Sequence, residues 1–169
     1  GQVGLRLAAE LTALGLAVTG IDRDPRAANL RTARALGIPV LIGDGSRRRI
    51  LARVRVDRAL ALCAVGSDEL DNVAVAVTAR AVAPQLRVVM RAGNHDVIAE
   101  TTSLFRIGTV CDVTELTSAY VVSCVAGDRP VVALPDGESI RVRSEGSTTA
   151  VAASGLACPH AESSRRPPA

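Results

Sequence analysis

The sequence of 169 residues contains no lysine and no tryptophan, and it has only one phenylalanine and one tyrosine. Without lysine the chain has neither the GK[ST] signature of a Walker-type phosphate loop nor an amine for Schiff-base chemistry. The scarcity of rings means that any core is built from Ala, Val, Leu and Ile, which is typical of parallel α/β sheets. The length fits one domain together with whatever its termini carry.

Metal and disulfide frameworks are also missing. The four cysteines are widely spaced with no CxxC pair, and His95 has no second His or Cys near it. This spacing excludes a zinc motif and a disulfide framework, so we expect reduced thiols and no metal site. No apolar run reaches the roughly 18–20 residues of a membrane span. We therefore expect a cytoplasmic protein, whose partner can still be membrane-bound.

The charge pattern argues against nucleic acid as a partner. All of the Lys+Arg total of 20 is arginine, and the net charge is only +3. Arg47-Arg48-Arg49 and Arg165-Arg166 are local basic clusters. Aromatic stacking partners are missing, however, and acidic residues are interleaved with the basic ones, so the pattern does not favour nucleic-acid binding.

Apolar spacing and turn residues predict a regular alternation of helices and strands. Asp24-Pro25 is expected to begin the second helix as its cap and first residue. The predicted helices are 2–14, 24–36, 46–53, 68–82, 96–104 and 113–122, and the predicted strands are 17–21, 39–42, 59–63, 86–90 and 109–111. This alternation indicates an α/β fold, a Rossmann-like doubly wound parallel sheet.

The pattern changes after Gly127. Residues 131–134 and 139–143 flank an Asp-Gly turn and predict a β-hairpin. From Ser144 the chain is rich in Ser, Thr, Ala, Pro and Arg without periodicity, which is typical of disorder. We expect a domain over residues 1–126, a hairpin over 127–143 and a disordered tail over 144–169.

The first residues predict a phosphate-binding loop. Gly1-Gln2-Val3-Gly4 leads into a helix and matches the second half of a GxGxxG motif. Glycine lets a pyrophosphate approach the backbone, and the helix start offers unpaired N–H groups. Two glycines alone are weak evidence, since glycine is common where helices begin.

Asp22 strengthens the interpretation because it stands at the end of the predicted strand 17–21 and lies 18 residues after Gly4. That spacing is near the interval of about 20 residues to the ribose-binding acid. A carboxylate there accepts hydrogen bonds from ribose hydroxyls and repels a 2′-phosphate, which favours NAD, ADP or ATP and disfavours NADP. Alternatively, Asp22 is a solvated turn residue. Arg23 either stacks on adenine or is an ordinary surface arginine.

Four segments together resemble one family. They are Ile21–Pro25 (IDRDP), Leu36–Ser46 (LGIPVLIGDGS), Asp68–Asn72 (DELDN) and Val88–Arg91 (VVMR). This combination resembles the TrkA N-terminal type of domain, the RCK domains that regulate conductance of potassium, over roughly residues 1–122. The resemblance implies the Rossmann-like fold already indicated by the alternation.

The resemblance also implies a ligand site. In that family the turn at Gly43, Asp44, Gly45 and Ser46 lies beside the adenine end of the ligand, and Asp44 and Ser46 are expected contacts. Gly45 departs from the family's usual Ala, which we expect to loosen the turn.

Further expected contacts follow the predicted strands 59–63 and 86–90. The resemblance places Ser67, Asp68 and Asn72 near the phosphates and the second ribose, although Ser67 or Asp68 can instead cap the helix. Arg91 lies at a carboxyl strand end, where doubly wound sheets bind ligands. It faces a phosphate or forms a surface ion pair.

These observations predict a regulatory module rather than an enzyme. NAD(H) or ADP/ATP is the expected regulatory ligand, with no catalytic residues, and the resemblance implies a potassium channel or transporter subunit as membrane partner. A homo-oligomer is expected, with Leu116 and Tyr120 either between protomers or in an ordinary core. The alternatives are an NAD-dependent oxidoreductase fragment that lacks its substrate domain and an oligomerisation module with an empty cleft.

We also expect a strand upstream of Gly1, since the GxGxxG motif is entered part-way. That strand would be central in the 3-2-1-4-5-6 order. Without it, we expect residues 1–169 alone to be weakly stable and to bind nucleotide weakly.

Overall fold

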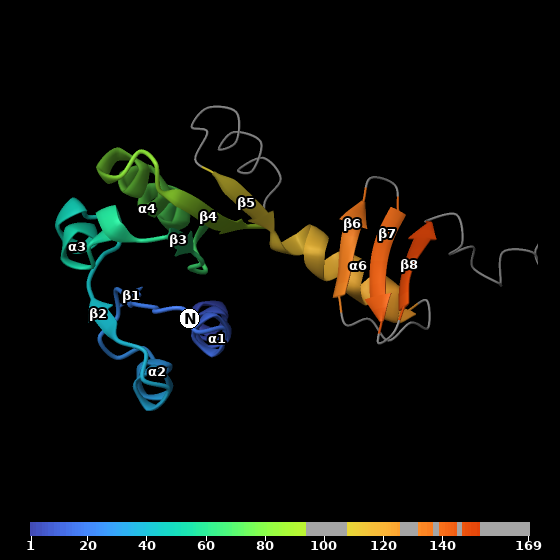
Figure 1. The fold of residues 1–169 in the computed structure, drawn as a ribbon, viewed down its shortest axis with the longest axis horizontal. Helices are drawn as coiled ribbons and strands as arrows, with labels where there is room; N and C mark the ends of the chain where they lie inside the picture. Colours follow the sequence, from blue (N-terminus) through green and yellow to red (C-terminus); the bar gives the residue numbers. More distant parts are fainter. Residues whose placement is uncertain (94–107, 126–131, 137–138, 145–146, 153–169) are drawn as a thin grey trace, which may run out of the picture. The chain divides into compact units, whose positions relative to one another are not determined.

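The computed structural model describes residues 1–93, 108–125, 132–136, 139–144 and 147–152 (Figure 1). They fall into two compact units, Gly1–Asp112 and Val113–Ala169. The predicted helix over 96–104, His95 and residues 153–169 lie outside the described residues.

The first unit alternates helices and strands along the chain, as predicted. Its helices are α1 (Gln2–Ala13), α2 (Leu30–Ala35), α3 (Arg48–Arg53) and α4 (Glu69–Val82), with a 3₁₀ turn at Val56–Arg58. Its strands are β1 (Gly20–Asp22), β2 (Val40–Ile42), β3 (Ala61–Ala64), β4 (Arg87–Ala92) and β5 (Thr109–Asp112).

All strand pairs in this unit are parallel, which confirms the predicted α/β class. β1 pairs with β2, with Ile21 opposite Leu41, and a second sheet has the order β3-β4-β5, with Val89 between Cys63 and Thr109. No strand pairing joins the two sheets within the described residues. Parallel strands align their carboxyl ends, so each sheet presents its connecting loops at one edge.

The second helix begins later than predicted. α2 starts at Leu30, with Asn29 in the cap position. Asp24 instead organises a turn, because its Oδ1 accepts a hydrogen bond from the Arg26 backbone N–H at 2.8 Å. Its carbonyl accepts another from Ala27 N–H at 3.2 Å. An aspartate before proline favours a turn as readily as a helix start, and sequence alone does not separate the two.

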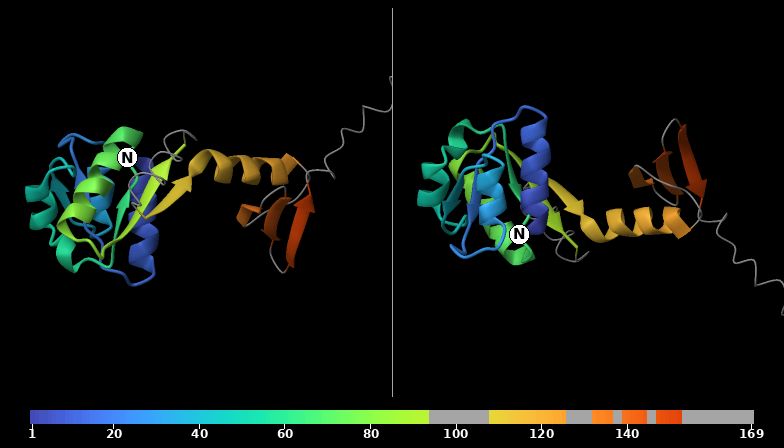
Figure 2. Two further views of the ribbon diagram at one scale, coloured as in Figure 1. Left: turned by 90° about the horizontal axis from the view of Figure 1, so that it is seen from above. Right: turned by 90° about the horizontal axis from the view of Figure 1, so that it is seen from below.

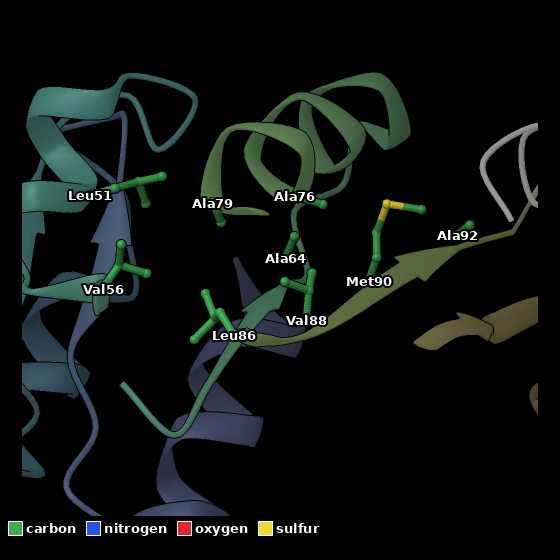
Figure 3. Close-up of a cluster of buried hydrophobic side chains, with 9 residues drawn as sticks. All are labelled: Leu51, Val56, Ala64, Ala76, Ala79, Leu86, Val88, Met90 and Ala92. Atoms are coloured by element: carbon green, nitrogen blue, oxygen red, sulfur yellow. The ribbon is translucent and has the colours of Figure 1, made fainter. Parts of the chain in front are cut away.

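The hydrophobic core lies where α4 covers β3 and β4 (Figure 3). Alternate residues of β4 are buried on one face, and Ala76 and Ala79 of α4 are fully buried. Small side chains at this helical spacing let α4 approach the sheet closely. The cluster consists of Leu51, Val56, Ala64, Ala76, Ala79, Leu86, Val88, Met90 and Ala92.

The second unit contains α6 (Val113–Val125) and three antiparallel strands in the order β6-β7-β8 (Figure 2). The strands are β6 (Val132–Asp136), β7 (Ser139–Ser144) and β8 (Ser147–Ala152), and Asp136 pairs with Ser139. β8 lies in the segment predicted to be disordered from residue 144. Its Thr and Val residues suit a strand, but the hydrogen-bonding partner on β7 supplies the order, and no local periodicity reveals it.

Within the described residues, no helix is both long enough and apolar enough to cross a membrane.

Gly108 provides a test of the packing before β5. Its φ is +132°, and a Cβ there would lie 2.3 Å from the Val88 carbonyl oxygen. Gly37 also has a positive φ of +70°, but nothing lies within 4 Å of its Cβ position. We predict that Gly37→Ala costs about 1 kcal/mol through backbone strain alone. Gly108→Ala should cost more than about 2 kcal/mol, because strain and a backbone clash combine.

Urea denaturation followed by circular dichroism measures both variants. Equal losses of unfolding free energy would contradict the close approach of Gly108 to β4.

Candidate functional site

The predicted site residues gather at the carboxyl ends of the first unit's strands. Asp22 ends β1, the turn from Gly43 follows β2, the loop around Gly66 follows β3, and Arg91 is near the end of β4. Contacts among these loops and the first turn of α4 make them one connected surface.

The glycine-led helix lies beside Asp22. The backbone nitrogen of Gly1 is 3.7 Å from Asp22 Oδ2, and the Gly1 carbonyl accepts the first helical hydrogen bond from Leu5 at 3.1 Å. A Cβ on Gly4 would lie 3.5 Å from the Val65 side chain, so α1 passes close to the end of β3. The predicted phosphate loop and the predicted ribose acid are therefore neighbours. Gln2 and Val3 are exposed on the first turn.

Asp22 takes part in the turn after β1, and its contact with a ribose stays a prediction. Its side chain is 27% exposed, and Oδ1 accepts a hydrogen bond from the Asp24 N–H at 3.0 Å. This contact gives Asp22 a part in the turn after β1. Its second oxygen is the one directed toward Gly1, which leaves the carboxylate facing both the turn and the helix start.

Asp44 organises the turn after β2. Its Oδ1 accepts hydrogen bonds from Ser46 N–H at 2.9 Å and Ser46 Oγ–H at 2.7 Å, and Oδ2 accepts from Arg47 Nε at 3.3 Å. The Ser46 hydrogen bonds, with Arg47 and Arg23 nearby, lower the pKa of Asp44 to about 2. Asp44 and Ser46, both predicted ligand contacts, are thus hydrogen bonded to each other in this structure.

Packing explains both glycines of this turn. A Cβ on Gly43 would lie 2.6 Å from Ile50 Cδ1, so the chain approaches α3 too closely for a side chain. A Cβ on Gly45 would lie 3.3 Å from Val75 Cγ2 of α4 and 3.9 Å from Ile21 Cγ2. The turn therefore lies close to α4 and β1 at Gly45, and the expectation that Gly45 loosens it stays a prediction.

Arg23 connects both sheets' loops. Its guanidinium nitrogen lies 3.0 Å from Asp71 Oδ1 and 3.6 Å from Asp44 Oδ1. The hydrogen bond and charge of Asp71 raise the pKa of Arg23 above its ordinary value, so it remains a cation. Of the two roles considered, the ion-paired surface arginine is the one present here, and adenine stacking stays a prediction.

Asp68 caps α4. Its Oδ1 accepts a hydrogen bond from the Asp71 N–H at 2.8 Å, and its carbonyl accepts from Asn72 N–H at 3.2 Å. Ser67 is exposed beside it. Capping thus accounts for Asp68, while ligand contact by Ser67 and Asp68 stays a prediction.

Asn72 is buried and holds the loop after β3 to the end of β4. It is 3% exposed, its Oδ1 accepts from Gly66 N–H at 2.8 Å, and its Nδ2 donates to the carbonyls of Gly66 at 3.0 Å and Arg91 at 3.1 Å. The predicted ligand contact is therefore a positioning residue in this structure. Arg91 also reaches this loop, donating from its guanidinium to the Gly66 carbonyl at 3.5 Å.

Glu69 is a member of this arrangement that sequence reasoning missed. Its Oε1 accepts a hydrogen bond from Gly93 N–H at 2.7 Å. An acid in a helix's first turn is usually assigned to the helix dipole, so no local pattern indicates this longer contact. Together, Glu69 and Asn72 attach the start of α4 to the end of β4.

The described residues include no group of three His, Cys, Asp or Glu placed to hold a metal ion. Cys63 on β3 is exposed, and desolvation, with a smaller effect of Cys111, raises the pKa of its thiol. A raised pKa reduces the reactive thiolate fraction.

The parallel sheets, the glycine-led helix and the acid at the end of β1 define a Rossmann-type nucleotide-binding domain. The TrkA-N domain model matches residues 1–107, and the chain belongs to the TrkA-N domain family. This confirms the resemblance found in the sequence.

Solved structures share the fold. The NAD(P)-binding domain of an exopolyphosphatase-related protein from Archaeoglobus fulgidus has a TM-score of 0.64 at 18% identity, covering 76% of this chain and 93% of its own. The TrkA-N domain of the inner membrane protein ybaL from Escherichia coli has a TM-score of 0.65 at 19% identity, covering 74% and 90%.

A third structure, the GsuK channel bound to NAD, has a TM-score of 0.57 at 20% identity. The match covers 68% of this chain and 20% of that channel. The search of curated proteins found no match.

The Asn72 contacts yield a stability prediction. Asn72→Ala removes the hydrogen bonds that a buried amide makes to three partly buried backbone groups, so we expect a loss of about 2–3 kcal/mol. Asn29→Ala is the matched control, because Asn29 makes no side-chain capping hydrogen bond in α2. Urea denaturation gives the free energies, and hydrogen exchange should show faster exchange at Gly66 only in Asn72→Ala. A loss equal to that of the control would contradict the positioning role.

The pKa of Asp44 yields a pH prediction. Because this pKa falls from 3.8 to about 2 on folding, the carboxylate stabilises the fold above pH 3.8 and loses this effect as pH falls toward 2. We expect the unfolding free energy of wild type to exceed that of Asp44→Asn by at most about 1 kcal/mol at neutral pH, since the paired arginines are exposed. Thermal unfolding of both proteins should show a constant difference from pH 7 to 5 that shrinks below pH 4. A difference that persists unchanged at pH 3 would refute the assignment.

Proposed function

We propose that this chain is a regulatory nucleotide-binding domain of a potassium channel or potassium uptake system. NAD(H) or ADP/ATP is the proposed ligand, bound at the carboxyl edge of the strands. The observation that carries the proposal is that Asp22, at the carboxyl end of β1, lies beside the glycine-led start of α1, with Oδ2 3.7 Å from the N-terminal amino nitrogen of Gly1.

That approach matches what an adenosine diphosphate group requires. A pyrophosphate binds where a helix begins, and the ribose hydroxyls donate to an acid at the end of the neighbouring strand. Asp22 and the start of α1 are close enough to contact adjacent parts of one ligand. The negative charge of Asp22 disfavours the 2′-phosphate of NADP.

Family membership and the GsuK structure support the transport role. GsuK is a channel solved with NAD, and ybaL is an inner membrane protein with a TrkA-N domain. For this chain we propose a membrane channel or transporter subunit as partner, a cytoplasmic location and a homo-oligomer. Tyr120, Val121 and Val125 are exposed on α6, which supports pairing of protomers through that helix.

Regulation needs no bond-forming chemistry from this chain. A ligand that binds one arrangement of the assembly more tightly shifts the equilibrium toward it. Asp44, Arg23 and Asp71 connect the loops of both sheets, so a ligand that recruits Arg23 or Asp44 changes contacts with α4. This linkage gives a route from the nucleotide to the rest of the assembly.

Isothermal titration of the full-length protein with NADH, NADPH, ADP and ATP tests the proposal. We predict that Asp22→Asn weakens NADH binding by about 10-fold or more, because a charge-assisted hydrogen bond is lost. The same substitution should reduce the ratio of NADH affinity to NADPH affinity. Asp57→Asn is the control, since Asp57 is exposed and forms an ion pair with Arg55 at 3.4 Å. Unchanged NADH affinity in Asp22→Asn would overturn the proposed site.

Two further measurements separate regulation from catalysis. The full-length protein should not oxidise NADH with a panel of carbonyl substrates, whereas an oxidoreductase would. Rubidium uptake by cells carrying wild-type or Asp22→Asn protein should differ if nucleotide binding controls transport. Equal uptake, despite lost NADH binding, would reject the regulatory role.

A further inference from the structure

We propose that a pocket beside α3 binds a small anion that carries adjacent phosphate groups, at a site separate from Asp22. The pocket has a volume of about 850 Å³, and its polar lining consists of Arg47, Arg48, Arg49, Arg53 and Asp44. We call it the α3 arginine pocket. It does not depend on the function proposed above.

The pocket carries uncompensated positive charge. Its acid, Asp44, is already engaged by Arg47 at 3.3 Å and Arg23 at 3.6 Å. No ion pair joins Arg48, Arg49 or Arg53 to any other residue that the structure describes. Three adjacent cations without counter-charges repel one another, and an anion placed among them relieves that repulsion.

Of the three, only Arg53 in the last turn of α3 lies where a cation favours the helix dipole, whereas Arg48 and Arg49 lie in a first turn that has no acidic residue. Arg49 and Arg53 are four residues apart on α3, and a like-charge pair at this spacing destabilises a helix. The basic residues are concentrated around the pocket rather than alternated with acids along α3. Ligand binding gives this arrangement a physical reason.

Phosphate is the anion that the side chains fit best. Guanidinium groups form paired hydrogen bonds with phosphate oxygens, and several of them can share a chain of phosphates. The volume lies within the range of about 300–1,000 Å³ for small-molecule sites. The lining has no aromatic ring to stack a base, so the phosphates, rather than a nucleobase, would be recognised.

The location keeps the site distinct but adjacent to the nucleotide site. Asp44 lines the pocket and also lies 3.6 Å from Arg23, whereas Asp22 is absent from the lining. An anion that attracts Arg47 would compete with Asp44 for that guanidinium. The two sites are therefore expected to share one carboxylate without sharing a ligand.

Titration of the full-length protein with inorganic triphosphate at 150 mM NaCl tests the proposal. Replacing Arg48, Arg49 and Arg53 together by Gln should weaken triphosphate binding at least about 10-fold. The matched control replaces Arg26, Arg31 and Arg34 by Gln. These arginines are exposed, and their replacement changes the net charge by the same amount near α2. It should weaken binding less than about 2-fold, as expected of long-range charge alone. Circular dichroism checks that both variants are folded.

Further ligands and one variant distinguish the sources of the phosphate. ATP that binds this pocket should lose affinity in the Arg48, Arg49 and Arg53 variant to the same extent as triphosphate does, whereas ATP bound only at the Asp22 site should not. Equal weakening in the two arginine variants, or no triphosphate binding at millimolar concentration, would overturn the proposal. Tighter arginine-dependent binding of single-stranded DNA than of triphosphate would also overturn it, in favour of a nucleic-acid surface.

Discussion

The buried amide of Asn72 is the contact on which the site's geometry depends. One side chain satisfies both backbone groups of Gly66 and the carbonyl of Arg91, so it fixes the loop after β3 to the end of β4. The amide itself is 3% exposed, so its own polar atoms depend on these partners, because a buried polar group without a hydrogen bond is costly. The loop after β3 is therefore held at a defined position relative to β4.

The loops of the two sheets are joined by side chains instead of by strand pairing. Arg23 reaches Asp44 and Asp71, and Gly45 packs against Val75 and Ile21. These connections are partly solvent-exposed ion pairs and one close approach of the backbone at Gly45. The ion pairs respond to charge more readily than the hydrogen bonds between paired strands do. A charged ligand at this edge therefore acts on the connections that relate the sheets to each other.

Most elements of the first unit could be predicted from local patterns, because buried strands and amphipathic helices leave a periodic apolar signature. The errors have local causes. Asp24-Pro25 fits both a turn and a helix cap, and β8 acquires its order from pairing with β7. Among the site residues, the resemblance indicated Asn72 as a ligand contact, but its hydrogen bond to Arg91 of β4 joins it to a distant part of the sequence, which local patterns do not reveal.

By itself the sequence determined the α/β class, the family and the placement of Asp22 after a glycine-led helix, since each rests on residues close together in the chain. The tertiary structure decided which polar groups face one another. It assigned Asn72 to the loop after β3, connected Glu69 to Gly93 and brought Arg23 to Asp71. The physical reason is that hydrogen bonds and burial depend on distances across the fold, which local periodicity does not specify.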